Sequence, residues 1–437
     1  MSIKYILNYQ MSLSRHCFSS SKGTMVGMPM PPKPKLFYGW WVLFAAVALQ
    51  ILIATFMMQS FGAFLALIKD EFTWSKTDIS SAFAVQQIVG GVLGPFVGWL
   101  LLKFGSRRVI RFGIAIFALS VYLLSKISSL QGFYLVVVLI AVGSSTSGFL
   151  PLNTLIVQWF EKRRAMALAL MQTGINAGGF LVPAVTWSLA SNGWRFTAIA
   201  YAVIILLIGI PLTFVIKNKP EDMGLVADGL SAAEQSLKKY VANELSAQEA
   251  LKTRAFWFIA FGHSSALMIV FAVMVHLVLY LTEDLGFGLA KAGSVFALLT
   301  AFTIIGQLLG GYFGDRINKR LIASMAMLGH ALGLVILVYA KNYYWIIAFS
   351  VFHGLAWGFR GPIMQAMRAD YFGRKSFGQI MGFSTPILTL GIATGPLIAG
   401  YLADKYANYQ IGFLVLAGLA VLGSLFFVFA SPPKNYN

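Results

Sequence analysis

The sequence has 437 residues, of which 58% are hydrophobic and only 11% are charged. A water-soluble protein of this composition would expose very large apolar patches, so the composition excludes one and favours a protein that faces lipid. The formal charge of +18 would indicate nucleic-acid binding in a soluble protein, but the distribution of Lys and Arg along the chain suggests another explanation. The single cysteine, Cys17, excludes an intrachain disulfide bond.

The first 37 residues contain no Asp or Glu, several Ser, and a Pro-rich stretch at 29–34. This composition is typical of an organelle transit peptide. No amphipathic stripe is clear in it, however, and the first apolar helix can itself direct membrane insertion. We therefore expect residues 1–37 to be a disordered cytoplasmic extension, and a true start at Met25 or Met28 is the other simple explanation.

Apolar segments long enough to cross a bilayer follow one another from Tyr38 to Ala430. A hydrocarbon core of ~30 Å takes about 20 apolar residues per helix. Unbroken apolar runs such as 199–210 favour helices over the short alternating strands of a barrel. We expect an all-α membrane protein whose twelve transmembrane helices span 38–67, 78–102, 108–126, 131–158, 165–190, 196–216, 254–280, 290–313, 321–340, 345–369, 376–402 and 410–430.

Lys and Arg alternate in density from one loop to the next. If both termini lie on one side of the membrane, that side carries 25 of the 33 Lys and Arg residues, Arg368 among them, and the other side carries 7. Arg360 belongs to neither side. Loops rich in Lys and Arg stay in the cytoplasm, so we expect both termini in the cytoplasm, in an inner or plasma membrane. The excess charge then reports topology, and we expect no nucleic-acid partner.

A sequence repeat divides the chain into two halves. Residues 98–108, after the second predicted helix, match residues 311–321, after the eighth, at an offset of 213. Residues 159–160 likewise match 371–372. Two parallel repeats with a substrate site between them are one architecture of secondary transporters, although duplication also suits a scaffold. We expect two pseudo-symmetric six-helix bundles, 38–216 and 254–430, a cytoplasmic linker, 217–253, and a cytoplasmic tail, 431–437.

The repeated loops resemble the G-x-L-x-D-R-x-G-R-R/K signature of the major facilitator superfamily, once in each half. Residues 38–41 at the start of the first helix and 159–167 before the fifth resemble the monocarboxylate transporter family and its oxalate/formate antiporter relatives. The superfamily resemblance covers 38–430. It implies the major facilitator fold and a small-molecule substrate held in a central cavity between two bundles that open alternately to either side.

The resemblance also implies a charged latch at the cytoplasmic ends of the helices. A carboxylate at one helix tip can cap the next helix and pair with an Arg across the bundle interface, and such a latch must break when the cavity opens inward. In the second half, the residues that suit this role are Asp315, Arg316, Lys319 and Arg320. In the first half, Leu102 stands where the signature has Asp. A topology anchor is therefore as good an explanation as gating for the matching residues Gly98, Gly105, Arg107 and Arg108.

Arg360 stands deep within the tenth predicted helix, where an Arg costs roughly 2.5 to 3.5 kcal/mol on insertion scales. Its counterpart in the first half is Leu150, so the repeat does not require it. An Arg can grip a carboxylate through two parallel hydrogen bonds. We therefore predict an anion-binding role for Arg360, and the alternative is an Arg satisfied by helix carbonyls or a polar neighbour.

Other polar residues lie in segments that line the cavity in superfamily members. His353 lies seven residues before Arg360 and so falls on nearly the same helix face. A buried neutral His is also common, and an amide or His in a membrane helix often serves only to join helices. His330 falls in the ninth helix, which is peripheral in the superfamily, and we do not include it. The candidate substrate-binding residues are Arg360, His353, Gln307, Asn153, Asn176, Gln86 and His263.

The sequence departs from the monocarboxylate transporters at their charged positions. The Asp and Arg that those proteins carry four residues apart on the eighth helix correspond here to Thr303 and Gln307, and the acidic residue at the start of their first helix corresponds to Tyr38. No Asp or Glu lies deep in a predicted helix, so proton symport through a carboxylate has little support. Anion exchange, facilitated diffusion, or coupling through His353 or His263 remain open.

These patterns predict a secondary active or facilitative transporter of a small organic anion such as a monocarboxylate, which works as a monomer with a counter-transported anion or a proton as a further partner. We expect no enzyme activity, no cofactor and no metal ion, because the helices hold no nucleophile with its base and no ligand cluster. The sequence has no Walker A loop for ATP, and the two-fold repeat argues against a channel. A transporter-like sensor or scaffold, or a carrier of a neutral or drug-like solute, are the alternatives.

Overall fold

The computed structural model describes residues 37–228 and 244–433. The predicted N-terminal extension therefore lies outside the described residues except for Phe37, as do residues 229–243 of the linker and residues 434–437 of the tail. The described residues from Tyr38 onward belong to a single unit.

The apolar runs of the first half form helices, because backbone groups in lipid must find their hydrogen bonds within the segment. Several of these helices follow one another without a turn, and Gly193, with a φ of 77°, separates the fifth span from the sixth within α9. The helices are α2 (Gly39–Ala54), η1 (Thr55–Ser60), α3 (Phe61–Phe72), α4 (Lys76–Phe104), α5 (Ser106–Leu124), α6 (Leu130–Ser147), α7 (Phe149–Trp159), α8 (Arg164–Ala177), η2 (Gly178–Leu181), α9 (Val182–Ile204), η3 (Ile205–Gly209) and α10 (Ile210–Val215).

The linker and the second half continue the helical pattern. The linker contributes two short helices, η4 (Pro220–Met223) and α12 (Ala247–Lys252). The helices of the second half are α13 (Arg254–Leu279), η5 (Tyr280–Asp284), α14 (Leu289–Gly314), α15 (Lys319–Val338), α16 (Tyr343–Phe372), α17 (Phe377–Tyr406) and α18 (Gln410–Phe429).

The described helices confirm the prediction of twelve spans. Nine helical stretches among the described residues are apolar and long enough to cross a membrane, and one of them, Arg164–Val215, has 52 residues and holds two spans. The remaining two spans are α5, whose first turns carry three arginines, and α16, which carries two arginines and a histidine within its length. The charged and polar side chains lower the mean hydropathy of α5 and α16, so a count of spans by hydropathy leaves these two helices out.

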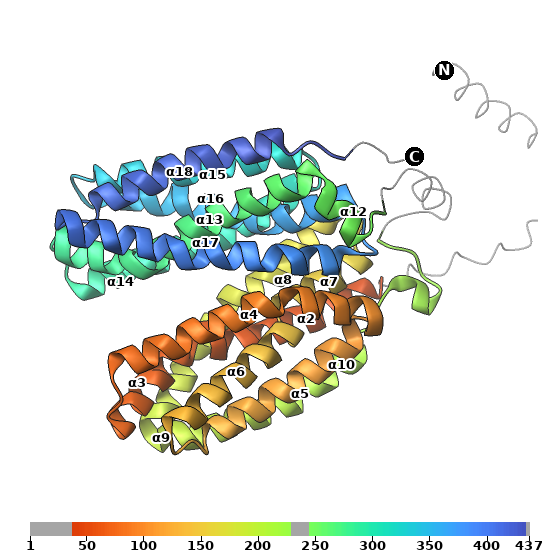
Figure 1. Cartoon of the computed structure of the whole chain (residues 1–437), viewed down its shortest axis with the longest axis horizontal. Helices are drawn as coiled ribbons and strands as arrows, with labels where there is room; N and C mark the ends of the chain where they lie inside the picture. The colour runs from red at the N-terminus through yellow and green to blue at the C-terminus, as the bar shows by residue number, and fades with distance from the viewer. Residues whose placement is uncertain (1–36, 229–243, 434–437) are drawn as a thin grey trace, which may run out of the picture. The chain divides into compact units, whose positions relative to one another are not determined.

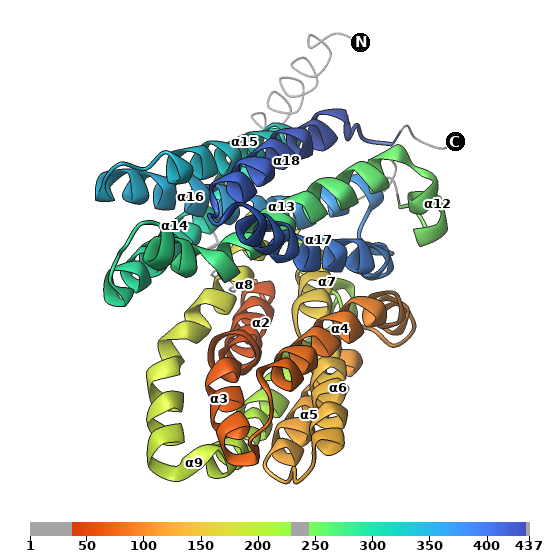
Figure 2. The same ribbon diagram turned by 60° about the vertical axis from the view of Figure 1, so that its left-hand side comes forward.

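The helices form two bundles. In both Figure 1 and Figure 2, α2–α10 make up the lower bundle and α13–α18 the upper bundle. We call them the N-terminal and the C-terminal bundle. The two bundles pack against each other through α4 with α17 and α8 with α14. Each bundle is held by buried apolar side chains, such as Phe56 and Phe117 in the N-terminal bundle and Phe256 and Phe349 in the C-terminal bundle.

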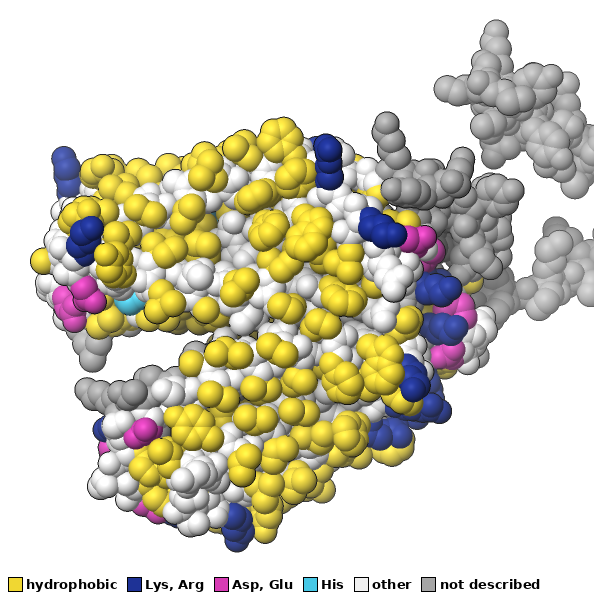
Figure 3. Space-filling view, viewed as in Figure 1, with side chains coloured by type: hydrophobic (Ala, Val, Ile, Leu, Met, Phe, Trp, Pro, Cys, Tyr) yellow, Lys and Arg dark blue, Asp and Glu magenta, His cyan; other side chains and the backbone are white. Residues whose placement is uncertain are grey.

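The two ends of the molecule differ. We call the end at which η4 and α12 lie the linker end. The space-filling view shows a cleft between the bundles that opens at the opposite end, whereas the bundles are closed together at the linker end (Figure 3). Lys and Arg side chains gather at the linker end in the same view. The two bundles are therefore closed together at one end and apart at the other.

Glycines allow the close approach of the bundles near the linker end. A Cβ atom on Gly98 of α4 would lie 2.6 Å from the carbonyl oxygen of Gly378 of α17, and one on Gly311 of α14 would lie 2.7 Å from the Cβ of Ala169 of α8. Gly98 and Gly311 are equivalent in the repeat. The same small residue therefore permits the same close contact twice, on the two sides of the interface.

Candidate functional site

Two arginines lie inside the C-terminal bundle on α16. Arg360 and Arg368 are 2% and 1% exposed. Nε and Nη1 of Arg360 have no hydrogen-bond partner within the described part of the chain. Arg368 donates from Nη1 and Nη2 to Nδ1 of His263, both at 3.2 Å, and from Nη1 to Oε1 of Gln365 at 3.4 Å. Neither guanidinium group forms an ion pair with a described carboxylate.

Two histidines lie beside these arginines. Nδ1 of His330, on α15, is 3.2 Å from Nδ1 of His353, on α16, and both rings are fully buried. Nε2 of each ring has no partner among the described residues. On α16, Arg360 follows His353 by seven residues and precedes Arg368 by eight, which is about two helical turns in each direction. We call these four side chains, together with His263, the basic cluster.

The basic cluster has an excess of positive charge and of unused donors. An unpaired buried charge is unfavourable because its desolvation is not compensated by a partner. An anion placed at Arg360 would supply both the missing charge and the missing acceptors. The cluster is therefore suited to hold an anion. Because Arg360 is almost fully buried, such an anion can reach it only when the surrounding helices move.

A row of amide side chains joins the bundles beside the basic cluster. Asn176 of α8 donates from Nδ2 to Oε1 of Gln307 of α14 at 3.2 Å, across the bundle interface. Gln172 donates from Nε2 to Oδ1 of Asn153 at 3.4 Å, and its Oε1 lies 2.6 Å from where a Cβ on Gly361 would stand. These amides, which we call the amide row, thus lie between the bundles next to the helical turn that carries Arg360.

Gln86 is the one predicted candidate that the structure leaves apart from both groups. Its Nε2 lies 3.2 Å from Sδ of Met57 within the N-terminal bundle, and its Oε1 is buried without a partner among the described residues. The structure places the other predicted residues in the basic cluster (Arg360, His353 and His263) or in the amide row (Gln307, Asn153 and Asn176).

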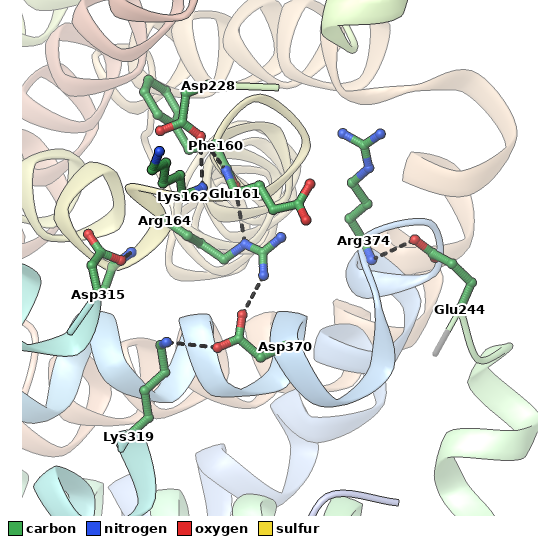
Figure 4. A network of polar contacts seen from close by, with 11 residues as sticks. Phe160, Glu161, Lys162, Arg164, Asp228, Glu244, Asp315, Lys319, Asp370 and Arg374 are labelled. Atoms are coloured by element: carbon green, nitrogen blue, oxygen red, sulfur yellow. Dashed lines mark hydrogen bonds and ion pairs between the residues drawn. The ribbon is translucent and has the colours of Figure 1, made fainter. Parts of the chain in front are cut away.

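At the linker end, Asp315 closes one side of the bundle interface (Figure 4). Its two carboxylate oxygens accept the backbone N–H groups of Ala165 at 2.8 Å and Met166 at 3.1 Å, at the N-terminus of α8. The cap differs from the prediction, because Asp315 caps a helix of the other bundle, while the next helix, α15, is capped by Asn318. Burial raises the pKa of Asp315, against the opposing effect of the two N–H groups.

Asp370 of α16 adds a second contact across the same side. Nη1 of Arg164, from α8, lies 2.5 Å from Oδ1 of Asp370, and Nζ of Lys319 lies 2.8 Å from Oδ2 (Figure 4). Only the Arg164 contact crosses the interface here, because the three predicted gating cations, Lys319, Arg316 and Arg320, make their printed contacts within the C-terminal bundle. Arg316 donates to the carbonyl oxygen of Tyr312 at 2.7 Å, and Arg320 donates to the carbonyl oxygens of Phe427 and Val428.

Within the described residues, the side chains of the first copy of the signature make no such contact. Gly105 adopts a φ of 76°, and Asn218 of the linker accepts the backbone N–H of Arg107 at 2.9 Å, while the side chain of Arg108 is exposed. Leu102 lines a polar cavity of about 1170 Å³ at the linker end. Gly98 lies at the interface, against α17. The two copies of the signature therefore differ in their contacts. The second copy caps α8 of the other bundle through Asp315, whereas the first copy binds the linker through the backbone of Arg107.

Sequence reasoning missed several of these residues. Arg368 was assigned to the cytoplasmic side because the tenth helix was predicted to end at 369, but α16 continues to Phe372 and leaves Arg368 a full turn inside. His330 was set aside as peripheral, yet its ring contacts that of His353. Gln172 lies four residues before Asn176 on α8, and this helical spacing is a signal that would have found it.

Comparison with known proteins gives a consistent result. Residues 47–306 and 259–437 match the family model described as Major Facilitator Superfamily. The chain is 26% identical over 411 residues to "Monocarboxylate transporter 13" of Bos taurus, covering 91% of this chain and 92% of that protein. It is 25% identical over 432 residues to "Monocarboxylate transporter 11" of Homo sapiens, covering 95% and 87%.

Among solved structures, the fold is similar to that of "a Major Facilitator Superfamily (MFS) transporter, FucP, in the outward conformation". The TM-score is 0.68 at 15% sequence identity, and the match covers 90% of this chain and 98% of that one.

Proposed function

Because the chain belongs to the Major Facilitator Superfamily, we propose that it carries a small organic anion, of which a short carboxylate is the simplest case, across the membrane by alternating access. The protein is an integral, multi-pass membrane transporter. The proposal adds to this the substrate class, the side from which the substrate enters and the partner that moves with it.

The single observation that carries the proposal is the guanidinium of Arg360, whose Nε and Nη1 find no hydrogen-bond partner among the described residues. A membrane-buried Arg costs roughly 2.5 to 3.5 kcal/mol on insertion scales, and side chains that carry such a cost in a membrane helix usually serve a function. Arg360 has two buried N–H positions without an acceptor among the described residues, and the neighbouring Arg368 has only neutral partners there. A carboxylate supplies two acceptor oxygens to such a group.

The shape of the structure supports alternating access. The bundles are closed at the linker end and leave a cleft at the opposite end (Figure 3). If the linker end, where Lys and Arg gather, is cytoplasmic, then this is the outward-open state. Entry of the anion from the cleft would pass the amide row, and closure of the two bundles over it would bring the anion to Arg360.

The comparisons support the same substrate class. The bovine and human relatives are named as monocarboxylate transporters, and the chain aligns with them over nearly its whole length. The positions that correspond to the charged pair on the eighth helix of that family are neutral here, so the cationic role falls to the basic cluster of α16. With no described carboxylate in contact with that cluster, exchange of one anion for another, or uniport, fits the chain better than proton symport through an acid.

Ligand-dependent stability of the purified full-length protein tests the substrate class. A ligand that binds the folded state raises the melting temperature as its concentration exceeds its Kd. We expect stabilisation by a short monocarboxylate and none by the corresponding primary amide, which matches it in size but lacks the charge. Stabilisation by the amide or by uncharged sugars and nucleosides, and by no carboxylate, would remove the anion from the proposal.

Flux in proteoliposomes separates a carrier from a sensor. A carrier gives saturable uptake of the labelled carboxylate that unlabelled carboxylate inside the vesicle accelerates, whereas a sensor binds without flux. Acceleration by internal anion at constant pH, with no response to an imposed proton gradient, is the result expected for anion exchange.

A further inference from the structure

The linker end is closed by carboxylates on one side of the interface that have no counterpart in the bundle on the other side. Asp315 and Asp370, from the C-terminal bundle, hold the start of α8. The equivalent residues of the N-terminal bundle, at offsets of 213 and 212 in the repeat, are Leu102 and Gln158, and neither carries a charge. By symmetry alone, the start of α17 would therefore be held less firmly than the start of α8.

Glu221 of the linker places a carboxylate at the other side of the interface, next to the start of α17. Arg374, in the loop before α17, donates from Nη2 to Oε1 of Glu221 at 2.5 Å and from Nη1 to the carbonyl oxygen of Gln158 at 3.1 Å. Gln158 in turn donates from its Nε2 to the carbonyl oxygen of Arg374 at 2.7 Å. Glu221 thus provides negative charge to Arg374, to which Gln158 of the N-terminal bundle contributes an amide and a carbonyl.

We expect Glu221 to move together with the N-terminal bundle, because linker residues before and after Glu221 are hydrogen-bonded to that bundle. Before Glu221, Asn218 accepts the backbone N–H of Arg107 at 2.9 Å, and the indole of Trp159 donates to the carbonyl oxygen of Lys217 at 2.9 Å. After Glu221, the carboxylate of Asp228 accepts three backbone N–H groups at 2.5, 3.1 and 2.9 Å, from Glu161, Lys162 and Arg163.

The rest of the described linker belongs to the other bundle. Glu244 accepts the backbone N–H of Lys375 at 3.0 Å, and the N–H of Leu245 donates to the carbonyl oxygen of Phe372 at 3.1 Å. Figure 4 shows Asp228 bonded beside Glu161 and Lys162, and Glu244 bonded to the loop that carries Arg374. The Glu221–Arg374 pair therefore joins a linker segment carried by the N-terminal bundle to a loop of the C-terminal bundle.

We propose that Glu221 is a gating residue that replaces the carboxylate missing from the first copy of the signature, and that Asn218 and Asp228 position it. When the linker end opens, the N-terminal bundle carries Glu221 away from Arg374, and the pair breaks. The linker is then part of the gate as well as the connection between the bundles. This inference rests on the proposed alternating access but not on the substrate.

The test measures opening of the linker end without any substrate. Spin labels are placed on cysteines at Arg108 and Leu321, equivalent and exposed positions at the linker-end tips of α5 and α15, in a Cys17→Ser background of the full chain in lipid nanodiscs. A label pair on opposite bundles reports a short distance in the closed state and a longer one in the open state. We expect Glu221→Gln to raise the ratio of the open to the closed population about threefold, the size of effect typical of a partly exposed ion pair.

A rescue variant and a matched control complete the test. Leu102 borders the cavity that Glu221 and Arg374 also line, so Leu102→Asp has room to place a carboxylate toward the start of α17, as Asp315 does for α8. Leu102→Asp is expected to return the Glu221→Gln protein to the closed state. Glu249→Gln removes a linker carboxylate that caps only its own helix, α12, and is expected to change nothing. An unchanged ratio in Glu221→Gln, or an equal rise in Glu249→Gln, would overturn the proposal.

Whether or not a carboxylate binds at Arg360, these label distances report the gate. Failure of the anion proposal and failure of the gating proposal are therefore seen in different experiments.

Discussion

The N-terminal and C-terminal bundles share a helical framework but differ in charge. Where the C-terminal bundle has Arg360, Asp315 and Asp370, the N-terminal bundle has Leu150, Leu102 and Gln158. The features that the bundles share, such as the glycine contacts at Gly98 and Gly311, suit the movement of one bundle against the other. The features that they do not share are charged side chains suited to binding an anion or to holding the linker end closed. These side chains lie almost entirely in the second half.

The same comparison explains why a buried arginine can persist. Proteins retain residues that lower their stability when those residues serve function. The N-terminal bundle shows that this helix position accepts Leu without loss of the fold, since Leu150 is buried in the equivalent place. Under the proposed function, the stability cost of Arg360 is recovered when an anion binds.

The largest expected effect comes from making the two bundles alike at this position. Arg360→Leu removes the donors for the substrate anion, and hydrogen bonds to charged groups contribute about 1.5 to 3 kcal/mol each, so carboxylate uptake should fall by about a hundredfold or more. The measurement is initial uptake into proteoliposomes at matched protein content. Arg316→Gln is the control, because Arg316 donates only to its own helix, and its uptake should stay within about twofold of the parent.

The same variant should be more stable than the parent when no ligand is present. Removing the uncompensated charge of Arg360 recovers roughly 2 to 3 kcal/mol, as the insertion cost of a membrane Arg indicates. Denaturation of the two purified proteins in the same detergent measures the difference. A marked loss of stability in Arg360→Leu would mean that Arg360 has structural partners and would contradict its assignment to the anion.

The next effect concerns the two sides of the linker end. Asp315→Ala removes the cap from two backbone N–H groups of α8, at a cost of about 1 kcal/mol, so the open population at the linker end should rise about fivefold. The label pair on Arg108→Cys and Leu321→Cys measures it. This change should exceed that of Glu221→Gln, because the Asp315 carboxylate is more buried than the Glu221–Arg374 pair. The reverse order would show that the linker carries the main gate.

The smallest effect is a dependence on pH. Burial raises the pKa of Asp315, so the closed linker end binds protons more tightly than an open end in which this carboxyl faces water. Lowering the pH from neutral toward the raised pKa therefore favours the closed state. The charges that act on Asp315 are Lys319 and Asp228. Label distances at about pH 7.5 and about pH 5.5 measure the shift, and growth of the open population at the lower pH would contradict it.

The sequence was sufficient for the framework because a bilayer restricts the possible backbones. The length of apolar runs fixes the number of helices, and the repeat at 98–108 and 311–321 fixes their division into two bundles. It also singled out Arg360, which is buried in α16, and Asp315, which contacts the start of α8. It was less reliable for helix ends, and three further residues at the end of α16 moved Arg368 from the end of the helix to the interior.

The pairings between distant residues could not be predicted from a single sequence. His330 and His353 are 23 residues apart on neighbouring helices, and their contact depends on the rotation of each helix about its axis. Glu221 and Arg374 are 153 residues apart, and only the packing of the linker against both bundles brings them together. The repeat indicated that a carboxylate was missing at Leu102, but nothing in the sequence indicated that the linker supplies one.

The most direct test of the role of Arg360 is the thermal stabilisation that a short monocarboxylate gives to the purified parent protein and to Arg360→Leu. We expect the carboxylate to stabilise the parent, and we expect Arg360→Leu to melt at a higher temperature on its own but to gain no further stability from the carboxylate. Equal stabilisation of both proteins by the carboxylate would show that the anion binds elsewhere and would contradict the role assigned to Arg360.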